Sequence, residues 1–425
     1  MSQFQLLGLT PSFGFGDRTG LATPGHVEAM KRAGAGLAPI FAQQSIREMA
    51  RTGRTPHGVI ADALAGIESA GWQGPNGADA DHLKTKEDID ATLAAGFTFF
   101  TLDPSPHVDA SAVNLTEWDL EGRFMMIQDE VDWALEHADK QISLPNGTAL
   151  RLTRQDCLRA AIKYGRAVNH ACNLADHLKS SCKKLGRDHE VELSVDETDH
   201  PTTLAEHFIV AKRCLDRGMK LVSLAPRFIG DFEKGVDFKG DIAAFEASVA
   251  DHSAIAEMLG PYKLSLHSGS DKISIYTAFA RQTRGKFHVK TAGTSYLEAL
   301  RVIARVDPPF FRDIVYRARL RYNEDKATYH VSATTQSAPA PATIPMPGQL
   351  EAEYLENWAD VPNGKGFTKP GRQILHCTFG SILTDPVMQV MLKHELKRNA
   401  ELYRDILAEH FVKHLQALQS GLQAI

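Results

Sequence analysis

The sequence predicts a (β/α)8 barrel of the TIM type, with inserted helices and a C-terminal helical extension. Eight short apolar runs alternate with helical patterns, which is typical of parallel βαβ units. Most runs end in acidic, histidine or lysine residues, and the active site of such a barrel lies at the C-terminal ends of its strands. A length of 425 residues accommodates one large barrel with additions, or two ordinary domains. Eight units favour the closed barrel over a doubly wound open sheet, which stays an alternative.

The strands and helices are expected in strict alternation along the chain. The expected strands are 4–10, 37–42, 77–84, 97–103, 191–197, 221–227, 263–272 and 286–291. The helical patterns between and after them are 45–70, 86–95, 153–185, 204–217, 242–259, 295–306 and 309–324. The longest connection follows the fourth strand, where 114–140 is rich in Asp, Glu and Trp and predicts an inserted helix.

Three segments are predicted from this pattern. Residues 1–336 form the barrel, with an insertion at about 110–150 that shapes substrate access. Residues 337–372 begin with closely spaced prolines and are expected to form a surface loop, because proline disfavours helix. Residues 373–425 form an extension packed on the barrel, with a short strand or lid piece at 373–380 and an amphipathic helix over 386–422.

Composition argues against several classes of partner. The net charge of −5 gives no reason to expect nucleic acid or an anionic membrane. The five cysteines show no CxxC spacing, which favours reduced thiols in a cytoplasmic protein. We see no signal peptide and no apolar run near the ~20 residues that span a bilayer. A cytoplasmic enzyme acting on a small molecule is expected, and a homo-oligomer is possible.

The motif Asp79-Ala-Asp81-His82 is the strongest local cluster. Neutral imidazole is a common metal ligand, and a carboxylate beside it can serve as a general base. Asp81 and His82 point to opposite faces of a regular strand, but both can reach one site where the strand ends. The alternative is a capping or salt-bridging aspartate beside a satisfied histidine.

The fifth strand ends in three carboxylates within four residues, Asp196, Glu197 and Asp199. Such carboxylates repel one another unless a cation or protons intervene. Glu197 is the preferred catalytic acid or base. Asp199 or Thr202 can instead cap the next helix, and both interpretations can hold together.

Further candidates follow other strands. His267 is expected to face the barrel interior as a metal ligand, and Asp231 or Glu233 could supply another ligand from a loop. Arg227 suits bidentate binding of a carboxylate. The glycine-rich stretch 12–20 does not match GxGxxG, so no nicotinamide cofactor is expected. It is interpreted as a loop that carries Asp17 and Arg18 into the site. His410 and His414, one helical turn apart, are expected at the surface or an interface.

The chain resembles the tagaturonate epimerase family along nearly its whole length. The motifs that carry the resemblance are Gly14-Phe-Gly-Asp-Arg18, Phe41-Ala-Gln-Gln-Ser-Ile-Arg-Glu48, Ala78-Asp-Ala-Asp-His-Leu-Lys84, Phe97-Thr-Phe-Phe-Thr-Leu-Asp-Pro104, Pro226-Arg-Phe-Ile-Gly-Asp-Phe-Glu-Lys-Gly235, Leu266-His-Ser-Gly-Ser-Asp-Lys272 and His376-Cys-Thr-Phe-Gly-Ser381. The resemblance implies a metal-dependent barrel enzyme that interconverts D-tagaturonate and D-fructuronate.

The resemblance also implies roles for individual residues. Asp81 is the implied proton acceptor and Glu197 the proton donor. The implied ligands of a divalent metal, which could be Zn, Mn, Ni, Co or Fe, are His82, Glu233 and His267. Strand-end residues are expected to contact the substrate: Asp17, Arg18, Gln43, Lys84, Asp103, Arg227, Lys272 and Lys290.

The carbon that would be inverted is β to the ketone, so its hydrogen is not acidic. Retro-aldol cleavage, rotation of the aldehyde and re-addition is therefore the expected chemistry. The alternatives are a metal-dependent sugar-acid aldolase, a ketohexose 4-epimerase of the tagatose/fructose type, and a barrel that only binds a sugar acid.

Overall fold

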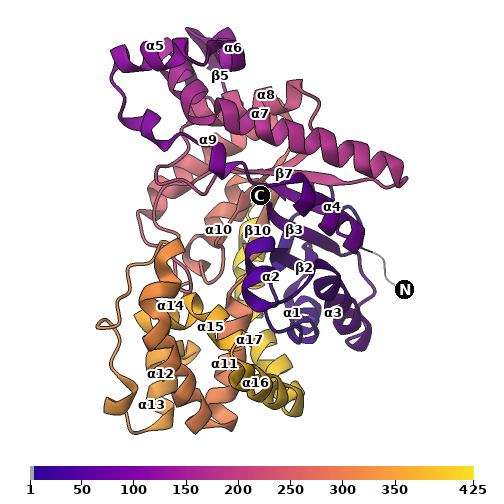
Figure 1. The fold of residues 1–425 in the computed structure, drawn as a ribbon, viewed down its shortest axis with the longest axis vertical. Helices are drawn as coiled ribbons and strands as arrows, with labels where there is room; N and C mark the ends of the chain where they lie inside the picture. The colour runs from indigo at the N-terminus through magenta and orange to yellow at the C-terminus, as the bar shows by residue number, and fades with distance from the viewer. Residues whose placement is uncertain (1–3) are drawn as a thin grey trace.

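Eight parallel strands close into a barrel in the computed structural model, which describes residues 4–425 (Figure 1). The strands are β1 (Ser12–Phe15), β2 (Ala38–Ser45), β3 (Gly77–Leu83), β4 (Phe99–Leu102), β7 (Glu190–Ser194), β8 (Leu221–Ala225), β9 (Lys263–Leu266) and β10 (Phe287–Thr291). They neighbour one another in the order β1, β10, β9, β8, β7, β4, β3, β2. The predicted TIM-type barrel is confirmed.

The first strand lies later in the chain than predicted. The segment 4–10 forms no strand and instead meets the N-terminal ends of other strands. Gln5 N–H donates to the carbonyl of Asn76 at 2.9 Å, and the Lys263 ammonium lies 3.4 Å from the carbonyl of Thr10. The true strand contains Gly14, where an added Cβ would lie 3.1 Å from the Gln43 side chain. Glycine there permits close packing inside the barrel. It therefore belongs to a strand and not to the predicted loop.

Helices follow the strands and cover the barrel. They are α1 (Thr23–Ala33), α2 (Ile46–Thr52), α3 (Pro56–Ser69), α4 (Lys86–Ala95), α7 (Arg154–Lys184), α8 (Leu204–Asp216), α9 (Ile242–Leu259), α10 (Ile273–Gln282) and α11 (Thr294–Val306). The predicted helix 45–70 is two helices, because Gly53 takes a left-handed φ of 65° and Thr55 caps a new helix. Threonine side chains also cap α4, α7 and α8.

The insertion after β4 is a set of short elements rather than one helix. It holds α5 (Glu117–Met125), α6 (Gln128–Val131) and a hairpin of β5 (Lys140–Ser143) with β6 (Ala149–Leu152). In Figure 1 it lies at one end of the molecule, and the helices that follow α11 lie at the other.

The C-terminal extension is entirely helical where it is regular. The helices that follow α11 are α12 (Pro308–Asp325), α13 (Pro347–Leu355), α14 (Pro370–Cys377), α15 (Phe379–Leu383), α16 (Pro386–Arg398) and α17 (Ala400–Leu422). Those from α14 onward span the extension predicted at 373–425, whereas α13 lies within 337–372, where a surface loop is expected. The strand expected at 373–380 is therefore wrong, since Ile374, Leu375 and Phe379 are buried at helical spacing. None of the helices within 4–425 is long and apolar enough to cross a membrane.

His410 and His414 lie in the core, which corrects their expected place at the surface. Both side chains are fully buried beside Asp271, in the loop after β9. Asp271 Oδ1 lies 3.1 Å from His410 Nε2, and its Oδ2 lies 3.2 Å from Arg372 Nη2 on α14. This buried ionic network joins α14 and α17 to the loop after β9, so these two helices share a buried core with the barrel.

We predict that Arg372→Met lowers the free energy of unfolding by about 3–5 kcal/mol, because Asp271 is left buried without its main counter-charge. Urea unfolding followed by circular dichroism measures the change. Arg404→Met, on an exposed pair with Asp405, is the matched control and should leave unfolding unchanged. Equal stability of wild type and Arg372→Met would contradict the assigned role.

Candidate active site

A cavity of about 520 Å³ opens at the C-terminal ends of the strands. Eight of the predicted site residues line it: Arg18, Gln43, Asp81, His82, Glu197, Arg227, His267 and Lys290. This volume suits a small-molecule ligand. The expected position of the active site therefore coincides with a cavity lined by many polar side chains.

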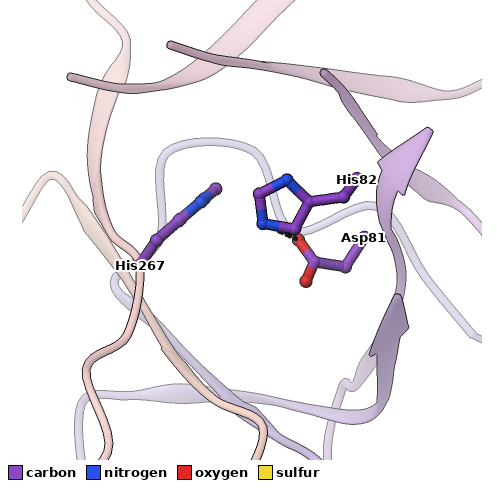
Figure 2. A group of neighbouring side chains, drawn as sticks. All are labelled: Asp81, His82 and His267. Atoms are coloured by element: carbon purple, nitrogen blue, oxygen red, sulfur yellow. Dashed lines mark ion pairs between the residues drawn. The ribbon is translucent and has the colours of Figure 1, made fainter. Parts of the chain in front are cut away.

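Asp81 and His82 both face this cavity although they are adjacent in β3 (Figure 2). The reason is local backbone geometry, because His82 has a φ of 54°, outside the extended region. The pairing of β3 with β4 also shifts register between Ala80 and Leu83. His82 Nε2 consequently lies 3.8 Å from Asp81 Oδ1. Left-handed backbone at a non-glycine residue is typical of functional sites.

His267 approaches from the end of β9, and its ring faces that of His82 in Figure 2. The two ring centroids are 5.1 Å apart, with an interplanar angle of 80°. Asp81, His82 and His267 each offer a ligand atom, and these atoms lie within 4.8 Å of one another. Two imidazoles and one carboxylate form a donor set that suits several divalent metals.

His82 has one carboxylate behind it, whereas both ring nitrogens of His267 contact a carboxylate. His82 Nδ1 lies 3.1 Å from Asp103 Oδ2, while His267 Nε2 lies 2.7 Å from Glu192 Oε1 and its Nδ1 lies 3.0 Å from Asp196 Oδ1. Such carboxylates orient metal-binding imidazoles in proteins. Asp103 thus contacts His82 rather than the cavity, where the sequence suggested a substrate contact.

The charges of the site fit a divalent cation. Burial alone would lower the pKa of both histidines, but Asp81 and Asp103 raise the pKa of His82 to about 9. Asp196 and Glu192 likewise raise the pKa of His267 to about 10. Without a metal both rings are therefore imidazolium at neutral pH. A divalent cation that replaced the two ring protons would leave the net charge of the site unchanged.

Lys290 lies beneath these groups and binds their carboxylates. Its ammonium is 2.9 Å from Asp79, 2.7 Å from Asp81 and 2.8 Å from Glu192. Burial opposes the charge, yet these carboxylates hold the pKa of Lys290 well above its usual value. In turn, although burial raises it, His82 and Lys290 lower the pKa of Asp81 to about 2. Asp81 is therefore ionised at neutral pH.

Glu197 lies at the more open side of the cavity. Its carboxylate accepts from Arg47 Nη2 at 3.1 Å and from Lys84 Nζ at 3.4 Å. Lys84 also lies 3.2 Å from Asp103, so it does not face the cavity as a free cation. The Glu197 side chain is 27% exposed, which lets it exchange protons with solvent.

Three predicted residues serve the surrounding loops and do not line the cavity. Asp17 accepts hydrogen bonds from the backbone of Thr19, Gly20 and Ala22, and so holds the loop after β1. The Lys272 ammonium donates to the carbonyls of Glu233 and Ser270. Glu233 accepts from Lys239 at 2.7 Å and from Gln373 at 2.6 Å. The structure does not bring Glu233 into the group formed by Asp81, His82 and His267.

The remaining predicted substrate-binding residues differ in whether other protein groups already bind their side chains. Gln43 Nε2 lies 3.4 Å from Asp81 Oδ2. Arg18 is paired with Glu48 and stacks 3.7 Å from the Phe379 ring centroid. Arg227 lies over the Phe232 ring and forms no ion pair with a carboxylate of the described chain. Arg227 is therefore available to an anionic ligand.

Sequence reasoning assigned no role to Asp79, Glu192, Asp196 or His376. A signal existed for Glu192, because Glu190-Val-Glu192-Leu alternates charged and apolar residues in a strand that is wholly buried. Alternation in a buried strand places the charged side chains inside the barrel. His376 lies on α14, more than eighty positions from any barrel strand, and only the fold brings it to the cavity.

Comparisons with known proteins give a consistent result. The tagaturonate epimerase family model matches residues 4–418. A tagaturonate/fructuronate epimerase from Thermotoga maritima is 41% identical over 416 residues, covering 97% of this chain and 81% of that protein. The native crystal structure of a fructuronate-tagaturonate epimerase from Cohnella laeviribosi is 34% identical, with a TM-score of 0.89 over 98% of this chain and 83% of that one. A glycerol complex of the Cohnella protein gives a TM-score of 0.90.

We predict that Asp103→Asn lowers the pKa of His82 from about 9, because the neutral amide no longer stabilises the imidazolium. The pKa falls because removal of the Asp103 negative charge favours the uncharged His82 ring over the imidazolium. NMR titration of the histidine rings in metal-free protein measures it. Asp90→Asn, whose carboxylate contacts the distant His177, is the control and should leave His82 unchanged.

Proposed function

Because the chain belongs to the tagaturonate epimerase family, we propose that it interconverts D-tagaturonate and D-fructuronate at this cavity with a bound divalent metal ion. The chain is a carbohydrate epimerase, an enzyme of the isomerase class. The observation that carries the proposal is the convergence of Asp81, His82 and His267 in the cavity. All three residues fall within the part of the chain that the family model matches.

We assign the metal to His82 and His267, with Asp81 as the adjoining carboxylate. His267 would bind the ion only by exchanging its contact with Asp196 or Glu192. Bound there, the ion would polarise the ketone oxygen of the substrate as a Lewis acid. Glu233 would join the ligand set only by exchanging its bonds to Lys239 and Gln373. Mixed nitrogen and oxygen ligation suits Zn, Mn, Ni, Co or Fe.

The geometry supports proton transfer by two carboxylates. Asp81 Oδ1 is held by Lys290, and among residues 4–425 Oδ2 has only the long contact to Gln43. In the proposed reaction Asp81 removes the hydroxyl proton at the carbon β to the ketone. The bond from this carbon to its neighbour then breaks, and the electron pair stays on the ketone fragment. After the aldehyde fragment rotates, the bond re-forms and Glu197 protonates the new alkoxide.

Lys290 is a poor candidate for imine chemistry, the other common route to aldol cleavage. An imine requires a neutral amine, and the raised pKa of Lys290 keeps it protonated. Its ammonium is also bound to four side-chain oxygens: Asp79, Asp81, Glu192 and Thr101. This arrangement supports a metal-assisted reaction.

The substrate carboxylate is assigned to Arg227. Lys84 and Lys272 are the alternatives, but each is already bound to protein oxygens, as is Lys290. Arg18 and Arg47 are paired with Glu48 and Glu197. Arg227 lines the cavity with a guanidinium that no carboxylate of the described residues neutralises, and its planar fork matches a carboxylate.

The function is tested by incubating metal-reconstituted protein with D-tagaturonate and following the sugar by NMR, beside an EDTA-treated sample. Appearance of D-fructuronate that depends on metal is expected. Accumulation of a free aldehyde would favour the aldolase instead. Turnover of D-tagatose or D-fructose with no reaction of D-tagaturonate would favour the ketohexose 4-epimerase.

We expect Asp81→Asn and Glu197→Gln each to lower kcat by about 10²–10⁴-fold, the usual contribution of a positioned acid or base. Bound metal, measured by elemental analysis, should persist in Glu197→Gln, because Glu197 is outside the proposed ligand set. Glu121→Gln, on the exposed surface of the insertion, is the control. Full activity in either active-site variant would contradict the assigned roles.

We expect Arg227→Gln to raise KM for D-tagaturonate by about 10–100-fold, because a charge-assisted bidentate contact contributes about 1.5–3 kcal/mol. Weak turnover of a neutral ketose should be unaffected. Steady-state kinetics on both sugars measures the contrast. Arg217→Gln, exposed and remote from the cavity, controls for loss of charge. Equal losses on acid and neutral sugars would exclude carboxylate recognition by Arg227.

A further inference from the structure

His376 reaches the active-site cavity from outside the barrel. It lies on α14 and is one of the residues that line the cavity. Its side chain is only 2% exposed. The ring lies against Gly293, just after β10, where an added Cβ would be 1.9 Å from His376 Cε1. The loop after β10 is therefore shaped to admit this imidazole.

Neither ring nitrogen of His376 has a hydrogen-bond or ion-pair partner among residues 4–425, and its Nδ1 is wholly buried. Three other buried histidines, His26, His288 and His410, each have a partner for one ring nitrogen. His26 Nε2 lies 2.8 Å from Ser295 Oγ, His288 Nδ1 lies 2.9 Å from Ser12 Oγ, and His410 Nε2 lies 2.8 Å from Thr294 Oγ1. A buried polar group without a partner costs about 1–3 kcal/mol. Nε2 is not enclosed in this way, so it is the ring nitrogen to which a ligand in the cavity would supply a partner.

The surroundings of His376 favour an uncharged ring. Burial, followed by the nearby cations Arg18 and Lys234, holds the pKa of His376 well below its ordinary value. A neutral imidazole has one N–H donor and one nitrogen acceptor. It therefore complements a hydroxyl group, which also donates and accepts, better than it complements a carboxylate.

The barrel order places His376 away from the proposed proton donor. In the closed sheet, β10 and β1 lie across the barrel from β7 and β4. His376 adjoins the loop after β10, whereas Glu197 follows β7. A sugar acid bound between them would be reached by Glu197 from one side and by His376 from the other.

We propose that His376 is a specificity-determining residue that binds, through its neutral imidazole, a hydroxyl group of the sugar acid other than the one that reacts. The identity of the sugar acid rests on the proposed function, but the contact with a polyhydroxy ligand rests on the cavity. This contact would give the His376 imidazole the partner that it lacks among residues 4–425. The position of the ring explains why glycine stands at position 293, where a Cβ would collide with it.

The test compares His376→Phe, which keeps an aromatic ring but removes both nitrogens, with His376→Gln, which keeps a donor and an acceptor. We expect His376→Phe to raise KM for D-tagaturonate about 10-fold, equivalent to about one hydrogen bond, with kcat changed less than about threefold. His376→Gln should recover part of this loss. Metal content should be unchanged in both. His394→Phe, exposed on α16, is the matched control.

A second measurement uses the wild-type chain and does not depend on the folding of a variant. Protein labelled with ¹⁵N-histidine is titrated with D-tagaturonate, and the His376 ring signal, identified by its absence from His376→Gln, is followed. A hydrogen bond to the sugar should shift it. Unchanged KM in His376→Phe, or an unshifted ring signal at saturating sugar, would overturn the proposal.

The proposed function can fail separately. If the wild-type chain does not epimerise D-tagaturonate, calorimetric titration with D-tagaturonate, D-tagatose and D-fructose identifies which sugar binds. The His376 variants are then compared on that sugar. Weaker binding by His376→Phe would support the contact although the proposed reaction is wrong, and equal binding would overturn it.

Discussion

The ammonium of Lys290 is the charge on which the active site depends. It lies within 2.9 Å of carboxylate oxygens from Asp79, Asp81 and Glu192, which come from two other strands of the barrel. Three buried carboxylates this close would otherwise repel one another or take up protons. With Lys290 present, Asp81 stays ionised beside His82, and Glu192 stays ionised beside His267. The barrel interior is consequently a polar core in which Lys290 neutralises the carboxylates nearest the cavity.

The residues at the C-terminal ends of the strands form the active-site cavity above this interior. The left-handed backbone of His82 turns a side chain that a regular strand would point away, so that adjacent residues share one cavity. The loop after β9 carries His267 and, four positions later, Asp271. Because Asp271 is tied to His410 and Arg372, the conformation of this loop depends on helices from the far end of the chain. The extension therefore contributes both support, through Arg372, and a cavity side chain, through His376.

Local pattern determined much of the fold. Alternating apolar runs and helical periodicity gave the closed barrel, seven of its eight strands in approximate position, and the bounds of α4 and α9. The failures were also local in origin. Glycine at position 14 resembles a turn signal because its role, close approach to Gln43 on the neighbouring strand β2, is visible only once the two strands pair. The segment 373–380 is short, so the helical spacing of its apolar residues is hard to distinguish from the pattern of a short strand.

The sequence by itself placed Asp81, His82, Glu197, Arg227 and His267 at strand ends, and the parallel barrel brings all strand ends to one rim. It could not decide which charges are already neutralised, because that depends on partners far away in the chain. Tertiary structure alone showed that Lys272, Glu233 and Asp17 are bound by neighbouring loops, that Lys290 is enclosed by carboxylates, and that His376 lacks a partner. Periodicity is a property of neighbouring residues, whereas the free or paired state of a buried charge is fixed by contacts across the whole fold.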